Sequence, residues 1–215
     1  MQNSSILFVV LLLLVIGAAN HFTVWSAVTE GNITASVIAQ CNLQLGSGWN
    51  YISLCAQPVN ASVAAVLQNL SYRYVMVWNA SSQEFEVYSP RASSPPFNSF
   101  DTNYSYFVLY DSATPSTLAV TGAMFNDTNI SMLQGWNPPT YPYIFISNLS
   151  CYLSSIASKY RYVMKWNTSA QDFLIYSPRA AQPQFTTIAR GEGQFISVTD
   201  PSGATLRYNK TACEA

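Results

Sequence analysis

The stretch YRYVMVWN at Tyr72–Asn79 occurs twice in this chain, because YRYVMKWN follows 88 positions later at Tyr160–Asn167. The match continues downstream without a gap, since QEFEVYSPRA at Gln83–Ala92 is repeated as QDFLIYSPRA at Gln171–Ala180. Self-similarity of this length at a fixed spacing is typical of a duplicated structural unit. The sequence therefore predicts two tandem copies of one module, each of roughly 85 residues.

A second repeated motif indicates how far the modules extend. The tripeptide GWN at Gly48–Asn50 returns at Gly135–Asn137, a shift of 87, so the second copy carries one extra residue between the blocks. We assign residues 41–125 to module 1 and residues 126–215 to module 2. The apolar content of the chain, 49%, is ample for a small hydrophobic core in each module.

The differences between the copies indicate strands. Tyr74, Met76 and Trp78 are unchanged in the second copy, whereas Val77 on the other parity is replaced by Lys165. Successive side chains of a strand point to opposite faces, so this pattern is typical of a strand with one buried face. We expect the tyrosine, methionine and tryptophan face to point inward and the arginine-bearing face outward.

Turn-forming residues divide the rest of each module into short elements. Polar residues 79–83 predict a hairpin loop, and apolar side chains at helical spacing in 61–70 predict one short helix. The strands that close the two copies are expected at 104–110, 116–125, 194–199 and 204–209. The predicted fold is mainly β: two tandem β-sandwich-like modules, each with one short helix, preceded by an N-terminal leader and an extra strand segment.

The chain begins with an apolar leader. Ile6 to Ala19 is an unbroken run of fourteen apolar or small residues, shorter than the roughly 20 that a membrane-spanning helix needs. Its small residues at the end predict a signal peptide over 1–19. The alternative is a retained anchor that continues to Val28, against which Asn20 and His21 count. In either case the rest of the chain lies outside the cytoplasm and meets the membrane only through the leader during export.

Residues 20–40 form an additional segment that the second module lacks. Residues that favour strands dominate it, with a turn-like break at Gly31–Asn32. One interpretation is an edge strand folded back on its own module. The other is a donor strand that completes the sheet of the next subunit, with the aromatic and aliphatic side chains as its contacts. These are Phe22, Val24, Trp25 and Val28.

Composition fits an exported glycoprotein. Only 9% of residues are charged, against about 25% in ordinary soluble proteins, and the net charge of −1 offers no basic patch for nucleic acid. The mature chain contains ten acceptor sites for N-linked glycans. They are Asn32, Asn60, Asn69, Asn79, Asn103, Asn126, Asn129, Asn148, Asn167 and Asn209. Asn79 and Asn167 hold the same place in the two copies, and so do Asn60 and Asn148, which could equally be helix caps.

Four cysteines in an exported chain imply two disulfides, for which three pairings are possible. We favour Cys41 with Cys55 and Cys151 with Cys213, because each bond then stays inside one module. The loop-entropy argument gives them roughly 3 and 4 kcal/mol. Metal binding is disfavoured, since His21 is the sole histidine and the cysteine spacings resemble no zinc pattern.

The sequence does not indicate an enzyme or a cofactor. A single histidine at the leader junction is poorly placed to serve a nucleophile in a folded module. Glu84 and Glu86 share a strand face and could be offered as a carboxylate pair, but adjacent acids on an exposed strand are usually solvated, and the second copy replaces Glu86 with Leu174. We expect no catalytic, metal or cofactor site.

The run GWNYISL at Gly48–Leu54 resembles the GWNLISL repeat modules of prokaryotic cell-surface proteins. In its organisation and composition, the chain resembles subunits of archaeal extracellular filaments, in which an N-terminal strand threads glycosylated β-rich domains together. The resemblance implies a structural subunit whose partners are other copies of itself. An adhesin or carbohydrate-binding module, or a protein associated with a surface layer, is the alternative.

Overall fold

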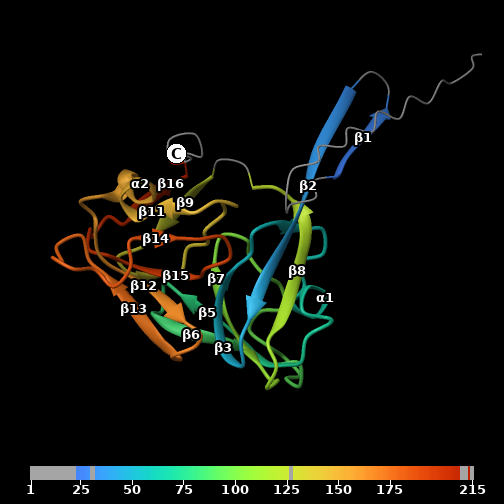
Figure 1. Ribbon diagram of the computed structural model, residues 1–215, viewed down its shortest axis with the longest axis horizontal. Helices are drawn as coiled ribbons and strands as arrows, with labels where there is room; N and C mark the ends of the chain where they lie inside the picture. Colours follow the sequence, from blue (N-terminus) through green and yellow to red (C-terminus); the bar gives the residue numbers. More distant parts are fainter. Residues whose placement is uncertain (1–22, 30–31, 126–127, 209–212, 214–215) are drawn as a thin grey trace, which may run out of the picture.

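Antiparallel strands dominate the part of the chain that the computed structural model describes, namely residues 23–29, 32–125, 128–208 and Cys213. Two β-sandwich-like modules lie side by side, the first in blue to green and the second in yellow to red (Figure 1). Their cores are separate clusters of buried apolar side chains, and a third cluster lies between them. The predicted fold class is confirmed.

Module 1 consists of two four-stranded sheets. The first has the order β1-β2-β8-β4, built from β1 (Thr23–Thr29), β2 (Asn32–Leu45), β8 (Ser116–Ala123) and β4 (Gln57–Pro58). The second has the order β3-β7-β5-β6, built from β3 (Gly48–Ser53), β7 (Ser105–Tyr110), β5 (Tyr72–Asn79) and β6 (Glu84–Tyr88). The one-turn helix α1 (Val63–Val66) follows β4 and is shorter than the expected 61–70.

Module 2 repeats the second sheet and abbreviates the first. The order β10-β15-β12-β13 is formed by β10 (Gly135–Asn137), β15 (Gln194–Val198), β12 (Tyr160–Asn167) and β13 (Asp172–Tyr176). The first sheet is reduced to one pair, β9 (Asn129–Met132) with β16 (Ala204–Arg207). A separate pair, β11 (Ser147–Asn148) with β14 (Thr187–Ile188), has its counterpart in the isolated bridge between Ser62 and Ser99 of module 1. Helix α2 (Leu149–Tyr152) and the 3-10 turn η1 (Ser154–Ile156) follow β11.

The repeated hairpin forms for a local reason. The side-chain carbonyl of Asn79 accepts the N–H groups of Ser81 and Ser82, at 2.9 and 3.3 Å, and closes the loop between β5 and β6. Gln83 then takes a left-handed conformation with φ of 57°. Asn and Asp form such turns readily because their short side chains reach the backbone two residues on. The predicted hairpin loop is confirmed.

The expected inward face of this hairpin was wrong. Val75 and Val77 are 0% and 8% exposed and point into the core of module 1. Met76 and Trp78, on the opposite parity, are only partly buried and belong to the cluster between the modules, while Tyr74 is 42% exposed. Both faces of β5 are therefore covered, one by its own module and one by the other. The repeat pattern predicted one buried face for this strand, whereas the structure has two.

Module 2 has a lysine in β12 at the position where β5 has the buried Val77. Lys165 stands where module 1 has Val77, and its side chain is 16% exposed. Its ammonium lies 2.9 Å from a carboxylate oxygen of Glu192, which removes most of the cost of burying the charge.

Both disulfides have the expected pairing. Cys41 in β2 is bonded to Cys55 after β3, which ties the two sheets of module 1 together. Cys151 in α2 is bonded to Cys213 near the end of the chain. Each bond stays within one module, as the sequence predicted.

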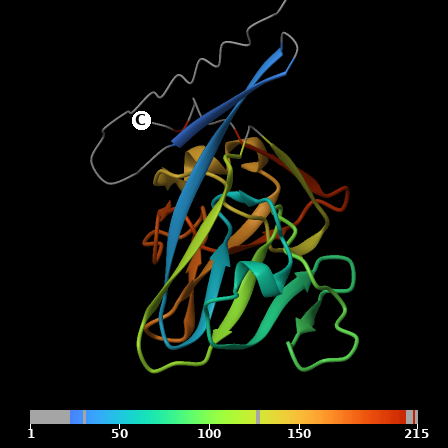
Figure 2. The same ribbon diagram turned by 90° about the vertical axis from the view of Figure 1, so that its right-hand side faces the viewer.

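The N-terminal segment forms a long hairpin. β1 pairs with the first part of β2, from Thr23 opposite Ile38 to Thr29 opposite Asn32. β8 pairs with β2 only from Ile38 onward, so the hairpin extends beyond the body of module 1 (Figures 1 and 2). β2 runs through residue 40 without a break, so the strand crosses the boundary drawn between segment 20–40 and module 1.

One carboxylate links the stability of the fold to pH. Asp200 accepts hydrogen bonds from the N–H and hydroxyl of Ser202 and lies 3.0 Å from the Lys159 ammonium. The bonds from Ser202 first, and then Lys159, lower its pKa from 3.8 to about 2. A depressed pKa means that this stabilisation is complete above pH 3.8 and is lost as the pH falls through 2.

We therefore predict a pH-dependent effect of Asp200→Asn, whose amide oxygen still accepts the bonds from Ser202. Thermal unfolding measured from pH 2 to 7 should give a lower midpoint for the variant at pH 5 to 7, with the difference shrinking below pH 4. A difference that stays constant down to pH 2 would contradict the role of the charge.

Candidate functional site

The repeated motifs meet at the contact between the two modules. Tyr51, Phe107 and Phe195 are buried there. The Tyr51 ring stacks on Phe107 with 4.2 Å between centroids and on Phe195 with 4.9 Å. Aromatic pairs of this kind contribute roughly 0.5–1.5 kcal/mol beyond the area that they bury. The cluster is therefore a third core shared by the modules.

A glutamine from each module binds the backbone of a tryptophan in the other. The side-chain oxygen of Gln83 accepts the Trp136 N–H at 2.8 Å, and its amide donates to the Trp136 carbonyl at 3.0 Å. Gln171 makes the same two bonds with Trp49, at 2.8 and 3.0 Å. We call these four bonds the reciprocal glutamine clasp. It explains why Gln83 and Gln171 hold the same place in the two copies.

The tryptophans of the hairpins complete the clasp. The indole N–H of Trp78 donates to the Trp136 carbonyl at 2.9 Å, and that of Trp166 donates to the Trp49 carbonyl at 2.8 Å. Each bonded carbonyl thus accepts from a glutamine and an indole at once. A carbonyl oxygen has two lone pairs, so both acceptor positions are used.

The glycine of each GWN motif is required by this geometry. Gly48 and Gly135 have φ of 88° and 100°, where only glycine is comfortable. A Cβ on Gly48 would lie 2.7 Å from the side-chain oxygen of Gln171, and one on Gly135 would lie 2.6 Å from that of Gln83. The asparagine of each motif folds back on the same turn, since Asn50 and Asn137 bond backbone groups two and four residues earlier.

Main-chain bonds repeat the reciprocity. On one side, Ser53 N–H donates to Gly191 O at 3.0 Å and Gly193 N–H donates to Tyr51 O at 2.9 Å. On the other side, Thr140 N–H donates to Asn103 O at 2.8 Å, which matches the bond of Ser53. Ser105 N–H donates to Pro138 O at 2.7 Å, which matches the bond of Gly193. The modules are thus related by an approximate twofold axis, as two subunits are in an isologous dimer.

This contact uses most of the tryptophans. Trp49, Trp78, Trp136 and Trp166 are partly buried against the shared cluster, which leaves Trp25 of β1 as the fifth tryptophan of the chain. Aromatic side chains that grip a sugar must present a free face. The four repeated tryptophans are therefore poor candidates for a carbohydrate platform.

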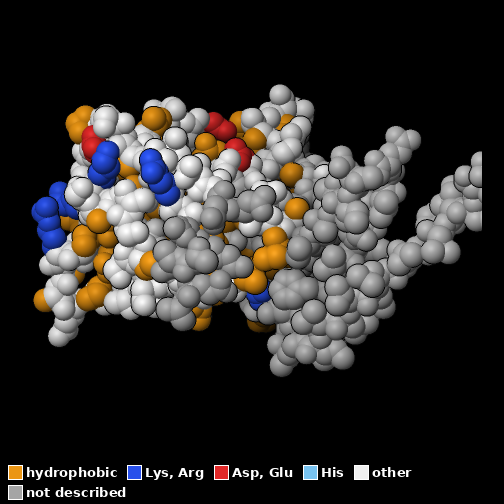
Figure 3. Space-filling view, turned by 90° about the horizontal axis from the view of Figure 1, so that it is seen from above, with side chains coloured by type: hydrophobic (Ala, Val, Ile, Leu, Met, Phe, Trp, Pro, Cys, Tyr) orange, Lys and Arg blue, Asp and Glu red, His pale blue; other side chains and the backbone are white. Residues whose placement is uncertain are grey.

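The glycan acceptor sites fall into three groups. Asn32 lies in β2, and Asn126 and Asn209 lie outside the described residues. Asn79 and Asn167 are half-buried, and Asn79 donates its amide to Glu86 at 2.7 Å. The exposed ones are Asn60, Asn69, Asn103, Asn129 and Asn148. On the face drawn in Figure 3, charged side chains are few and separated by uncharged surface, as the composition indicated.

The suggested helix-capping role is only partly seen. Ser62 is the N-cap of α1 and accepts the Ala65 N–H, while Asn60 accepts the Ser62 N–H just before it. Asn148 occupies the N-cap position of α2 without a side-chain capping bond. Neither asparagine is thereby needed to start its helix.

No other kind of site is indicated in the described ranges. Within them, no group of three or more His, Cys, Asp and Glu side chains could hold a metal ion, and no helix is long and apolar enough to cross a membrane. Glu84 is exposed, whereas Glu86 accepts the bond from Asn79, so the two acids have different surroundings.

Comparison of the chain with protein-family models, with curated proteins and with solved structures finds no match. The surfaces of this molecule are therefore the basis for assigning a function. Among the outermost strands of the sheets is β1, which has a strand partner on one side only. Of the predicted donor-strand residues, Val24, Trp25 and Val28 lie in β1, and Phe22 lies outside the described residues.

The clasp predicts a specific effect of Gln83→Glu. The carboxylate keeps the acceptor for Trp136 N–H but cannot donate to the Trp136 carbonyl, and it places negative charge against that oxygen. We expect a loss of about 1–3 kcal/mol in the free energy of unfolding, measured by urea denaturation at pH 7. Gln171→Glu should lower the free energy of unfolding by a similar amount, because it disrupts the equivalent pair of bonds with Trp49.

The matched control is Gln57→Glu, since the Gln57 side chain is exposed in β4. It should change the free energy of unfolding by less than about 0.5 kcal/mol. Equal effects of the three substitutions would show that the clasp carries no special stability.

Proposed function

We propose that this protein is a structural subunit of an extracellular, glycosylated surface filament, assembled by N-terminal donor-strand complementation. The observation that carries the proposal is the position of β1. It is the outer strand of a hairpin that extends beyond β8, so one of its edges faces no other strand in the described part of the chain.

The sequence of β1 supports this use. Exposed edge strands normally carry charges, prolines or bulges that prevent pairing with another chain. β1, TVWSAVT, has no charged residue and no proline, and its register with β2 is unbroken from Thr23 to Thr29. A strand without those protections is suited to pairing with a partner chain.

The rest of the molecule has the properties of a durable subunit. The reciprocal glutamine clasp and the shared aromatic cluster join the modules into one body. Two disulfides suit an oxidising, extracellular setting, and exposed acceptor sites for glycans are spread over both modules. Nothing in this arrangement requires a ligand or a reaction.

The proposal is tested by removing residues 20–29, which deletes β1 and leaves β2 intact. Material purified under native conditions should form filaments by electron microscopy when it is full-length, and single particles when it carries the deletion. The deletion should leave the thermal midpoint of the two-module body nearly unchanged. Full-length protein that remains monomeric, or a deletion variant that polymerises normally, would refute the proposal.

A charge substitution provides the matched comparison. Val24→Lys with Val28→Lys keeps the length of β1 but adds two charges on one face, and should prevent polymerisation. Val24→Ile with Val28→Ile keeps that face apolar and should preserve it. Flat two-dimensional arrays in place of threads would instead favour a surface-layer protein.

A further inference from the structure

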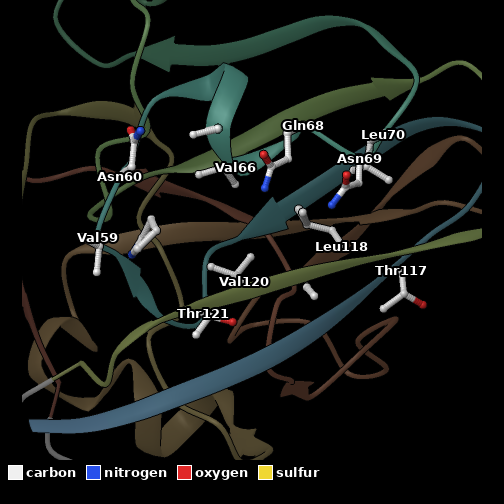
Figure 4. Close-up of a pocket in the computed structure, with 13 residues that line it drawn as sticks. Val59, Asn60, Val66, Gln68, Asn69, Leu70, Thr117, Leu118, Val120 and Thr121 are labelled. Carbon is white, nitrogen blue, oxygen red and sulfur yellow. The ribbon is translucent and has the colours of Figure 1, made fainter.

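A groove runs along β8 on the side away from β2, between this strand and helix α1 (Figure 4). Its volume is about 360 Å³. Leu118 and Val120, 3% and 2% exposed, line its β8 side, and the half-buried Val66 and Leu70 line the side of the helix. None of its thirteen described lining residues is charged.

The backbone of β8 is open toward this groove. β8 pairs with β2 along its whole length, from Ser116 to Ala123. On the other side it pairs with β4 only at Gly122 and Ala123. Within the described residues, no other strand lies against Ser116–Thr121 on that side. A strand edge beside an uncharged groove is an arrangement that can accept an added strand, whose main chain supplies affinity and whose alternate side chains fill the groove.

The corresponding groove of module 2 is bridged by its own side chains, beside a pocket of about 310 Å³. Tyr208 after β16 and Tyr152 in α2 bring strand and helix together, with their hydroxyls 3.0 Å apart. Burial raises the pKa of both tyrosines, so they remain protonated donors. The backbone N–H of Arg207 donates to the Ser155 hydroxyl at 3.0 Å, so η1 takes the place of a strand.

Module 1 has small residues where module 2 has this pair. The shift of 88 places Val120 at the position of Tyr208. The helices align at a shift of 86, since the Val63 N–H donates to Asn98 O as the Leu149 N–H donates to Thr186 O, so Val66 stands at the position of Tyr152. Neither valine can reach across, so the groove of module 1 has no such bridge.

We infer that the open groove along β8 is the acceptor site for residues 22–29 of a second copy of this chain. The inference rests on the proposed function and identifies its acceptor. The free edge of β8, Ser116–Thr121, has six residues and spans about 20 Å, which the seven residues of β1 match. Both surfaces are uncharged, and Phe22, Val24 and Val28 share one parity, so their side chains can enter the groove together.

The occupant comes from another copy because of the sheet order β1-β2-β8-β4. The chain's own β1 lies on the far side of β2, two strands away from the groove. Only residues 30 and 31 separate β1 from β2, which ties β1 to that side. A neighbouring subunit has no such restriction.

Two glycan acceptor sites border the groove, Asn60 and Asn69. In Figure 4 the side chain of Asn69 points from the segment after α1 toward β8. A glycan there would occupy the space of the added strand. We therefore expect Asn69 to be unmodified in assembled filaments, although its sequence is an acceptor site. Mass spectrometry showing a glycan at Asn69 in filaments would overturn the inference.

The decisive variant is Gln68→Trp. Gln68 is exposed, and its side chain points into the groove, so an indole there fills the space without removing core contacts (Figure 4). The matched control is Ser154→Trp, an exposed position at the bridged groove of module 2. Gln68→Trp should lose filament formation, whereas Ser154→Trp should polymerise as the unmodified protein does.

Mixing separates this inference from the proposed function. Gln68→Trp retains a donor without an acceptor, and the chain lacking residues 20–29 retains an acceptor without a donor. Each alone should be monomeric, and together they should form a one-to-one dimer by light scattering. If the deletion blocks polymerisation but Gln68→Trp does not, the acceptor site is wrong and the donor strand stands. If the deletion variant polymerises, both fail.

A peptide provides a second measurement that does not depend on the folding of a variant. A synthetic peptide of residues 20–29, added during assembly of the full-length chain, should occupy acceptor grooves and shorten the filaments. A peptide of the same composition in scrambled order should leave their length unchanged. Equal effects of the two peptides would overturn the inference.

Discussion

The reciprocal glutamine clasp is the contact on which the arrangement of this molecule depends. Each module supplies one glutamine side chain and one tryptophan backbone. Gln83 binds Trp136 and Gln171 binds Trp49, so neither glutamine and neither tryptophan backbone is left over for a further contact of this kind. A twofold contact of this kind closes on itself and cannot propagate. The proposed filament must therefore grow through a different surface. The free strands of module 1 are the surface that we propose, because the contact between the modules covers the second face of β5 and β12.

Much of the fold could be predicted from local patterns. The repeat located the hairpins, the turn at Asn79 and the closing strands, and module boundaries were enough to pair the cysteines correctly. The prediction for β5 chose the wrong face as the core of its own module. Alternation in the sequence indicates that a face is covered, but it does not indicate which part of the molecule covers it. Only the packing of the modules shows that Val75 faces one core and Trp78 another. The clasp itself joins residues 53 and 122 positions apart, which spacing within a module cannot reveal.

Of the two candidate assembly surfaces, the sequence predicted the donor strand but not the acceptor groove. A strand-forming segment ahead of module 1 is visible in the sequence, and its hairpin partner is the strand that continues into the module. The groove along β8 is not visible in the sequence. It depends on a helix that ends after one turn and on the lack of a described strand beside Ser116–Thr121. Val66 and Val120 are ordinary aliphatic residues until they are compared with Tyr152 and Tyr208, whose hydroxyls meet in module 2.

The order of strands in the first sheet has a mechanical consequence. The proposed donor and acceptor strands belong to the same sheet, β1-β2-β8-β4, so in the proposed filament tension would enter and leave each subunit through module 1. β2 would bear that load in shear against β8 over eight paired positions, and the Cys41 bond anchors β2 to the second sheet. Module 2 would lie beside the line of force. In such a filament the surface of module 2 would be free to change in sequence and glycosylation without weakening the thread.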